Sequence, residues 1–124
     1  MNQADQVFSL TETKGVLVVA PAGDTISYRD SDVAEAVSKV LARITGLIDA
    51  RVVVDLSGSK YFGSVMVGAI SQFAERVRLK GGAFAVCELS DDMHQVLTAM
   101  KLTDRWPVFD TQRAAIKFVS RCET

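Results

Sequence analysis

The most constraining feature of this sequence is an uninterrupted apolar run, Val52 to Val54, which ends in Asp55-Leu56 and is followed by turn residues. Because the run has no polar alternation, it predicts a strand buried on both faces, as in a parallel sheet. From Ser64 the apolar residues recur at helical spacing, and Gly81-Gly82 ends that pattern. A buried strand that leads through a loop into a helix places the helix start at the carboxyl edge of the sheet, where α/β proteins place their sites. The residue expected there is Ser64.

A hairpin and a helix are expected before this central unit. Residues 7–13 and 16–21 flank Lys14-Gly15, and their apolar content predicts two antiparallel strands joined by a tight turn. The first of these strands has the weaker pattern, because its alternation is imperfect. Apolar residues at helical spacing then predict a helix over about residues 31–45.

A strand and a helix are expected directly after the central unit. Residues 83–87 predict a second short buried strand, and Ser90 can cap the helix that follows. We expect Leu102 to close this helix. Its predicted buried stripe consists of Met93, Val96, Leu97 and Met100.

The last predicted elements are a short strand near Pro107 and a helix capped by Asp110 or Thr111. The inward residues of that helix are predicted to be Ala115, Ile116 and Val119. We interpret Trp106 as a hydrophobic lid over the final helix. Gly68, inside the central helix, lowers helix propensity, and we interpret it as a point of close contact between helix and sheet.

Strands that alternate with helices predict an α/β fold with a mostly parallel sheet and right-handed crossovers. The amino-terminal hairpin adds one antiparallel strand. The chain has 124 residues, of which 48% are hydrophobic and 23% charged, so we expect a single domain over residues 1–124.

Charge and composition exclude several classes of function. With 14 basic and 15 acidic residues the net charge is −1, so binding to nucleic acid or an anionic membrane is not expected. One histidine and two distant cysteines, Cys87 and Cys122, suit neither a disulfide framework nor a metal or cofactor site. The amino terminus lacks a signal-peptide pattern and no run is long enough to cross a bilayer, so a cytoplasmic location is expected.

The segment Asp55 to Ile70, D-L-S-G-S-K-Y-F-G-S-V-M-V-G-A-I, resembles the core motif of STAS domains, the bacterial anti-sigma-factor antagonists and their relatives. In that family Asp-Leu leads to an apolar pair and then to Asp-Ser-(Ser/Thr)-Gly at a helix start. The matching residues are Asp55, Leu56, Phe62 and Ser64. The positions at which this chain differs from the family motif are Gly63, Val65 and Met66.

The resemblance extends to other segments and implies an architecture. Gly23-Asp24 is similar to the family's Gly-Glu/Asp-Leu after the second strand, and residues 101–110, K-L-T-D-R-W-P-V-F-D, are similar to its G-L-x-x-x-F-P-x-F-x ending. The implied STAS fold has the order β-β-α-β-α-β-α-β-α, with helices chiefly on one side of the sheet.

The resemblance also implies a function for Ser64. In the family the matching serine is phosphorylated by a partner kinase, so the implied partners are a kinase-like anti-sigma factor and a phosphatase. A phosphate would lie at the positive end of a helix, and its charge of roughly −1.5 to −2 would weaken docking of an apolar partner face. The residues expected to contact the partner are Asp24, Ile26, Tyr28, Tyr61, Gly63, Ser64 and Val65.

Three alternatives to a phosphorylated Ser64 stay open, one for the serine itself and two for the function of the chain. Ser64 can simply cap the helix. The chain can also be an unphosphorylated scaffold or a transporter-associated regulatory domain, which the differences at Gly63, Val65 and Met66 favour. A serine hydrolase is the weakest alternative, since the Gly-x-Ser-x-Gly spacing is absent and a triad would need His94 with Asp55 or Asp24.

Overall fold

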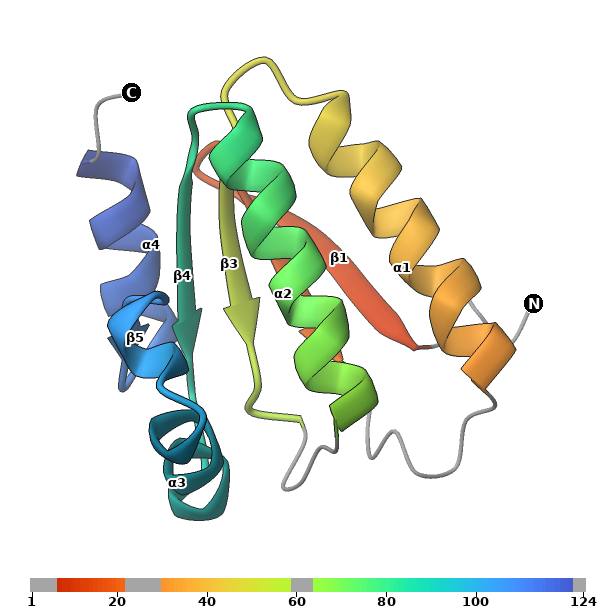
Figure 1. The fold of residues 1–124 in the computed structure, drawn as a ribbon. Coiled ribbons are helices and arrows are strands. Elements are labelled where there is room, and N and C mark those ends of the chain that lie inside the picture. The colour runs from red at the N-terminus through yellow and green to blue at the C-terminus, as the bar shows by residue number, and fades with distance from the viewer. Residues whose placement is uncertain (1–6, 22–29, 59–63, 122–124) are drawn as a thin grey trace.

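The structure, a computed structural model, describes residues 7–21, 30–58 and 64–121, and it contains a five-stranded sheet with helices on both faces (Figure 1). The sheet order is β1-β2-β3-β4-β5. The elements are β1 (Phe8–Thr13), β2 (Val16–Pro21), α1 (Asp30–Thr45), β3 (Arg51–Asp55), α2 (Ser64–Leu79), β4 (Ala83–Cys87), α3 (Asp91–Ala99), the 3₁₀ helix η3 (Leu102–Asp104), β5 (Val108–Phe109) and α4 (Gln112–Arg121).

The amino-terminal hairpin has the predicted turn. Lys14 and Gly15 both have positive φ, 54° and 80°, which is the backbone that a two-residue type I′ hairpin requires. β1 is antiparallel to β2, with Thr13 opposite Val16, and the three remaining strand pairs are parallel. The predicted mostly parallel sheet with one antiparallel strand is therefore confirmed.

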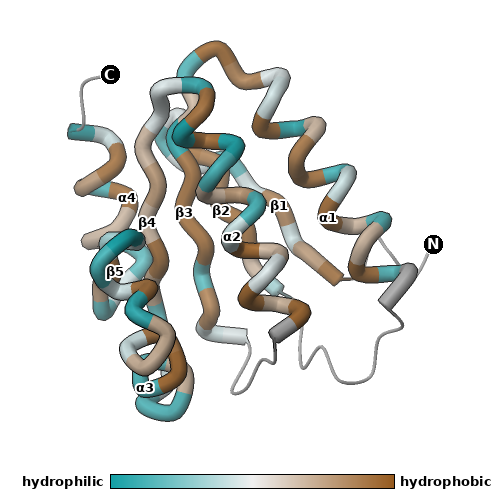
Figure 2. The backbone as a smooth tube through the Cα atoms, in the orientation of Figure 1, coloured by the Kyte–Doolittle hydropathy of each residue, from teal (hydrophilic) through white to brown (hydrophobic). Residues whose placement is uncertain are grey.

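The central strand β3 is buried on both faces, as its sequence predicts. Val52 and Val54 pack into the core beneath α1 and α2, whereas Val53 points to the opposite face and packs under α4. All three side chains are fully buried. The strand is hydrophobic along most of its length in Figure 2, which is what a strand covered by helices on both faces needs.

The larger of two hydrophobic cores lies between the sheet and the helices α1 and α2. Phe73 of α2 makes an edge-to-face contact with Phe8 of β1, with ring centroids 5.3 Å apart. α3 adds Met93 and Leu97 to this core. The smaller core lies under α4, whose buried residues are Ala115, Ile116 and Val119. The helices therefore cover chiefly one side, as expected.

A close approach of two chain segments follows the end of α2. Gly81 has a φ of 70°, and the amide of Gly82 donates to the carbonyl oxygen of Val77 over 2.9 Å, which closes the helix as predicted. A Cβ atom on Gly82 would lie 2.0 Å from the carbonyl oxygen of Ala50. Glycine is therefore required here, where β4 begins beside the residue that precedes β3.

The predicted boundary and buried stripe of α3 are wrong in part. Ser90 does cap the helix, accepting from the Met93 amide over 3.2 Å, but the helix ends at Ala99 and Leu102 belongs to η3. Val96 is 37% exposed and Met100 51% exposed. A nine-residue helix that contacts the core with one narrow stripe buries fewer residues than its apolar content suggests.

Two further interpretations are corrected by packing. Trp106 is buried on the same face of the sheet as α2, with its ring 6.2 Å from that of Phe84, so it lies on the side opposite to α4 and is not a lid over it. Gly68 is exposed, and a Cβ atom there would have no neighbour within 4 Å. Gly68 is therefore not a point of close contact with the sheet.

Candidate functional site

The buried carboxylate of Asp55 fixes the start of the loop that leads to α2. Asp55 is 5% exposed, and its Oδ1 accepts a hydrogen bond of 2.8 Å from the amide of Ser57. The amide of Leu56 donates to the carbonyl oxygen of Cys87 over 3.0 Å, so the chain stays attached to β4 for one residue beyond β3. An aspartate that accepts an amide two residues further on is a common turn arrangement.

The same carboxylate links the loop to the first turn of α4. The side-chain amide of Gln112 donates to Asp55 Oδ2, and the backbone amide of Gln112 donates to Glu88 Oε2 over 2.9 Å. Thr111 caps the helix by accepting from the Ala114 amide over 3.1 Å, as predicted. The ends of β3 and β4 and the start of α4 are thus joined by polar contacts at one edge of the sheet.

Cys87 also lies at this edge, as a buried free thiol. Burial raises the pKa of its thiol to about 12, and the nearby carboxylates of Asp55 and Glu88 add to the effect. Because the thiolate is the nucleophilic form, this environment disfavours the reactive form of the Cys87 side chain.

Ser64 begins α2, as the sequence predicts, after a loop that leaves the carboxyl edge of the sheet. Its side chain lies outside the described residues. In the same turn Met66 is fully buried, so it cannot contribute to a docking surface, while Val65 is 48% exposed. This first turn contains no acidic residue, so no carboxylate in it would compete with an anion for the free amides of the helix end.

Most of the other predicted contact residues lie outside the described residues: Asp24, Ile26, Tyr28, Tyr61 and Gly63. The described residues at which the chain enters these two segments lie next to each other. A Cβ atom on Gly58, in the loop before α2, would lie 3.2 Å from the carbonyl oxygen of Pro21, the last residue of β2. The chain therefore leaves the neighbouring parallel strands β2 and β3 at the same edge of the sheet.

The hydrolase interpretation gains no support from the geometry. His94 is exposed on α3, and its Nδ1 lies 3.5 Å from the hydroxyl of Thr98. The Asp55 carboxylate is bonded to Ser57 and Gln112 rather than to an imidazole. Within the described ranges, His, Cys, Asp and Glu side chains form no group of three that could hold a metal ion. No helix in those ranges is long and apolar enough to cross a bilayer.

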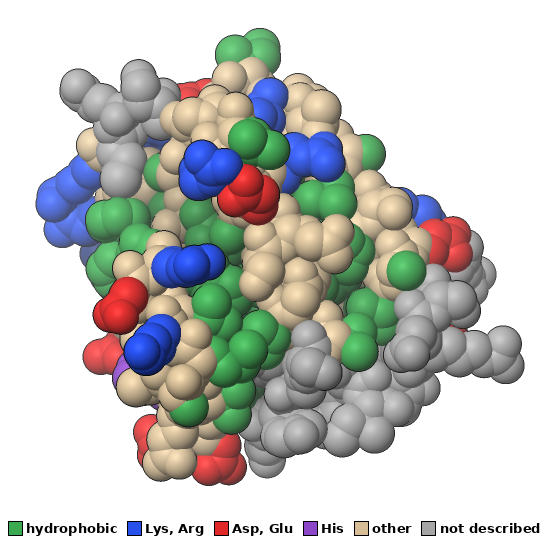
Figure 3. All heavy atoms as spheres, in the orientation of Figure 1, with side chains coloured by type: hydrophobic (Ala, Val, Ile, Leu, Met, Phe, Trp, Pro, Cys, Tyr) green, Lys and Arg blue, Asp and Glu red, His purple; other side chains and the backbone are tan. Residues whose placement is uncertain are grey.

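On the face formed by α1 and α2, hydrophobic side chains are exposed between charged ones (Figure 3). A groove of about 510 Å³ separates α2 from the segment 102–107, with Phe84 and Trp106 among its lining residues. Arg78 on its rim is paired with Glu75. The charge of this groove is thus partly compensated within the chain.

Comparison with known proteins gives consistent results. A family model described as STAS domain matches residues 8–115. Among solved structures, a STAS domain protein from Planctomyces limnophilus described as an anti-sigma-factor antagonist is 24% identical, with a TM-score of 0.77, and the match covers 91% of this chain and 97% of that one. The anti-sigma factor antagonist SpoIIAA in its unphosphorylated form is 18% identical, with a TM-score of 0.74 and coverage of 94% and 99%.

A transporter-related structure is also similar. The sulfate transporter family protein from Wolinella succinogenes is 12% identical, with a TM-score of 0.67 and coverage of 89% of this chain and 88% of that one. At these identities the structural matches show a shared fold. A comparison with curated proteins returns no match.

Proposed function

The chain belongs to the STAS domain family, and on that premise we propose that it is a non-catalytic regulatory module that binds a protein partner in the cytoplasm. The proposed partner is a kinase-like anti-sigma factor that phosphorylates Ser64, and a phosphatase restores the serine. The observation that carries this proposal is the position of Ser64 as the first residue of α2, after the loop that leaves the buried strand β3.

The proposed switch acts on the partner rather than on the fold. A phosphate at the start of α2 would receive hydrogen bonds from free amides and would be favoured by the helix dipole, so the modified chain stays folded. The neighbouring Val65 is exposed and apolar. A dianion beside an apolar contact has to lose its hydration when a partner docks, and this cost lowers affinity for the partner.

Incubation of the chain with a kinase-type anti-sigma factor and ATP, followed by tandem mass spectrometry, tests the switch. We expect one phosphate on Ser64 and none on the matched variant Ser64→Ala. Binding of the partner without any modification would reject the switch and favour an unphosphorylated scaffold. Modification at Ser57 instead would keep the regulatory class but reject the assigned residue.

A second candidate function is a transporter-associated regulatory domain. The structural similarity to the sulfate transporter family protein supports it, as do the non-family residues Gly63, Val65 and Met66. Co-purification of the tagged chain from detergent-solubilised membranes with a transporter, unaffected by Ser64→Asp, would support this candidate over the first.

A further inference from the structure

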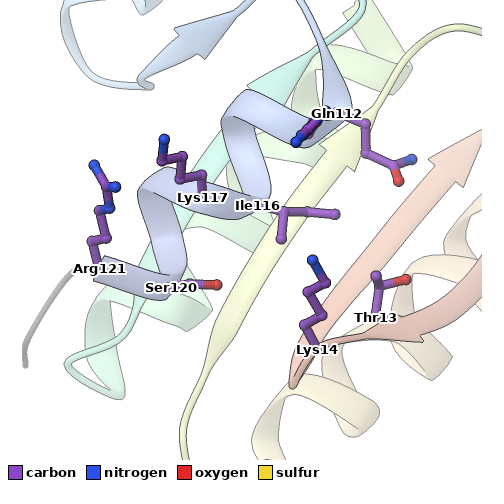
Figure 4. Close-up of a pocket in the computed structure, with 8 residues that line it drawn as sticks. Thr13, Lys14, Gln112, Ile116, Lys117, Ser120 and Arg121 are labelled. Atoms are coloured by element: carbon purple, nitrogen blue, oxygen red, sulfur yellow. The ribbon is translucent and has the colours of Figure 1, made fainter.

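A second surface with a distinct chemistry lies on the opposite face of the sheet from α1 and α2. It is a groove of about 600 Å³ between α4 and the β1–β2 turn (Figure 4). Ile116 and Lys14 approach it from opposite sides, and Ser120 lies beside Ile116. The lining residues are Thr13, Lys14, Gln112, Arg113, Ile116, Lys117, Ser120 and Arg121.

Four of the eight lining residues are basic and none is acidic: Lys14, Arg113, Lys117 and Arg121. Within the described residues these four form no ion pair, although Arg43 pairs with Glu12 and Arg51 with Asp49. The chain as a whole has a net charge of −1. Positive charge is therefore concentrated at this groove and left uncompensated by described side chains, which favours an anionic ligand.

The spacing of the basic residues indicates the shape of that ligand. Arg113, Lys117 and Arg121 follow one another at intervals of four residues along α4, so they form a stripe about 12 Å long. In Figure 4 the side chains of Lys117 and Arg121 extend from the side of α4 that faces away from Lys14, so these three cations do not converge on one point. A compact anion such as phosphate needs cations that converge. A row of separated cations instead suits an elongated anion with several carboxylates.

The groove also offers an apolar contact. Ile116 lies on the adjacent stripe of α4, between Gln112 and Ser120, and its side chain points into the groove (Figure 4). The aliphatic parts of the lysine and arginine side chains extend this apolar surface. A ligand that combines carboxylates with an apolar side chain would match both properties.

Both ends of α4 are held in place by hydrogen bonds. At the start, Gln112 is bonded to Asp55 and Glu88. At the other end, the guanidinium of Arg51 donates to the carbonyl oxygen of Ser120 over 2.8 Å. The α4 wall of the groove is therefore fixed at both ends, which lowers the entropy cost of binding.

We propose that this groove is a docking site for an acidic, partly apolar segment of a protein partner, with carboxylates opposite the four cations and an apolar side chain against Ile116. The proposed site does not include Ser64 and does not require its phosphorylation, because α4 lies on the other face of the sheet from α2. Failure of either proposal leaves the other intact.

The test measures fluorescence anisotropy of a short fluorescein-labelled peptide of glutamate and leucine, and of a matched peptide in which every glutamate is glutamine. The acidic peptide should bind and the neutral one should not. Lys117→Glu on α4 and Lys14→Glu on the turn should each weaken binding roughly tenfold, because attraction becomes repulsion. Lys101→Glu, an equal change of charge at an exposed residue outside the groove, should leave binding unchanged.

Three results would overturn the proposal. Equal affinity for both peptides would show that charge is not recognised, and an equal loss with Lys101→Glu would show that only net charge matters. The third result is displacement of the peptide by inorganic phosphate under conditions in which sulfate, at the same ionic strength, does not displace it. This result would indicate a site for a compact anion instead.

Discussion

At the scale of single residues, the buried carboxylate of Asp55 has the most consequences. Burial of an ionised group is costly unless its oxygens are hydrogen-bonded, and both oxygens of Asp55 have a partner, Ser57 on one side and Gln112 on the other. One side chain thus joins Ser57, where the chain leaves β3, to the first turn of α4.

Removal of the Gln112 side chain tests this role of Asp55. Gln112→Ala leaves one buried carboxylate oxygen without its donor, so we expect the free energy of unfolding to fall by about 1–3 kcal/mol. Gln72→Ala, at an exposed position of α2, should change it by less than about 0.5 kcal/mol. Urea unfolding followed by circular dichroism measures both, and equal effects would contradict the structural role of the Gln112–Asp55 contact.

The thiol of Cys87 should be unreactive in the folded chain, since its pKa is raised to about 12. In a Cys122→Ser variant, where Cys87 is the one remaining thiol, Ellman's reagent at about pH 8 should label the unfolded chain quickly and the native chain only at the rate of unfolding. Fast labelling of the native chain would contradict the buried, protonated state.

The same shift has a consequence for stability. In the unfolded chain the thiol ionises near its ordinary pKa of about 8.5, whereas in the folded chain it stays neutral up to about pH 12. The free energy of unfolding is therefore not reduced by this thiol below about pH 8.5. Above about pH 8.5 it falls as the pH rises, because the unfolded chain loses the thiol proton while the folded chain keeps it.

At the scale of elements, the sequence predicts strands and helix starts well because each depends on short-range chemistry, whereas the end of α3 lies at Ala99 and not at the predicted Leu102. The apolar run of β3, the paired positive φ of Lys14 and Gly15 and the cap at Ser90 are all local features. The burial of Val96 and Met100 is not local, since it depends on how much of α3 the rest of the chain covers.

Two glycines provide a test at this scale, because their surroundings are opposite. Gly68 lies in an exposed, open part of α2, so Gly68→Ala should raise the free energy of unfolding by about 0.5–1 kcal/mol through helix propensity. Gly82→Ala should lower it by more than about 2 kcal/mol, because the new methyl group meets the Ala50 backbone. Thermal unfolding by calorimetry distinguishes them, and a stabilising Gly82→Ala would contradict the close approach.

At the scale of the whole molecule, the alternation of strands and helices predicts the sheet topology, but not every contact across it. The Asp55–Gln112 contact joins residues 57 positions apart, and no sequence pattern marks it. Trp106 lies on the face opposite to the predicted one because the choice of face depends on how the chain crosses the sheet. The basic stripe of α4 is visible as a four-residue repeat, but only the fold brings Lys14 beside it.

The placement of Ser64 could be predicted because a buried strand followed by a loop and a helix fixes it at one edge of the sheet. The surface that a partner would contact there could not be derived in the same way. Its predicted residues, such as Ile26 and Tyr61, fall in segments that the sequence predicts as loops, and loop conformation is set by side-chain packing rather than by any repeat in the sequence.

The most direct test of the proposed switch is the affinity of a kinase-type anti-sigma factor for three forms of the chain, measured by isothermal titration calorimetry. Ser64→Asp should bind at least about tenfold more weakly than the unmodified chain, because a charge is placed at the start of α2, in the proposed docking surface. Ser38→Asp, which adds the same charge at an exposed position of α1, should bind as the unmodified chain does. Undiminished affinity of a folded Ser64→Asp variant would contradict the switch.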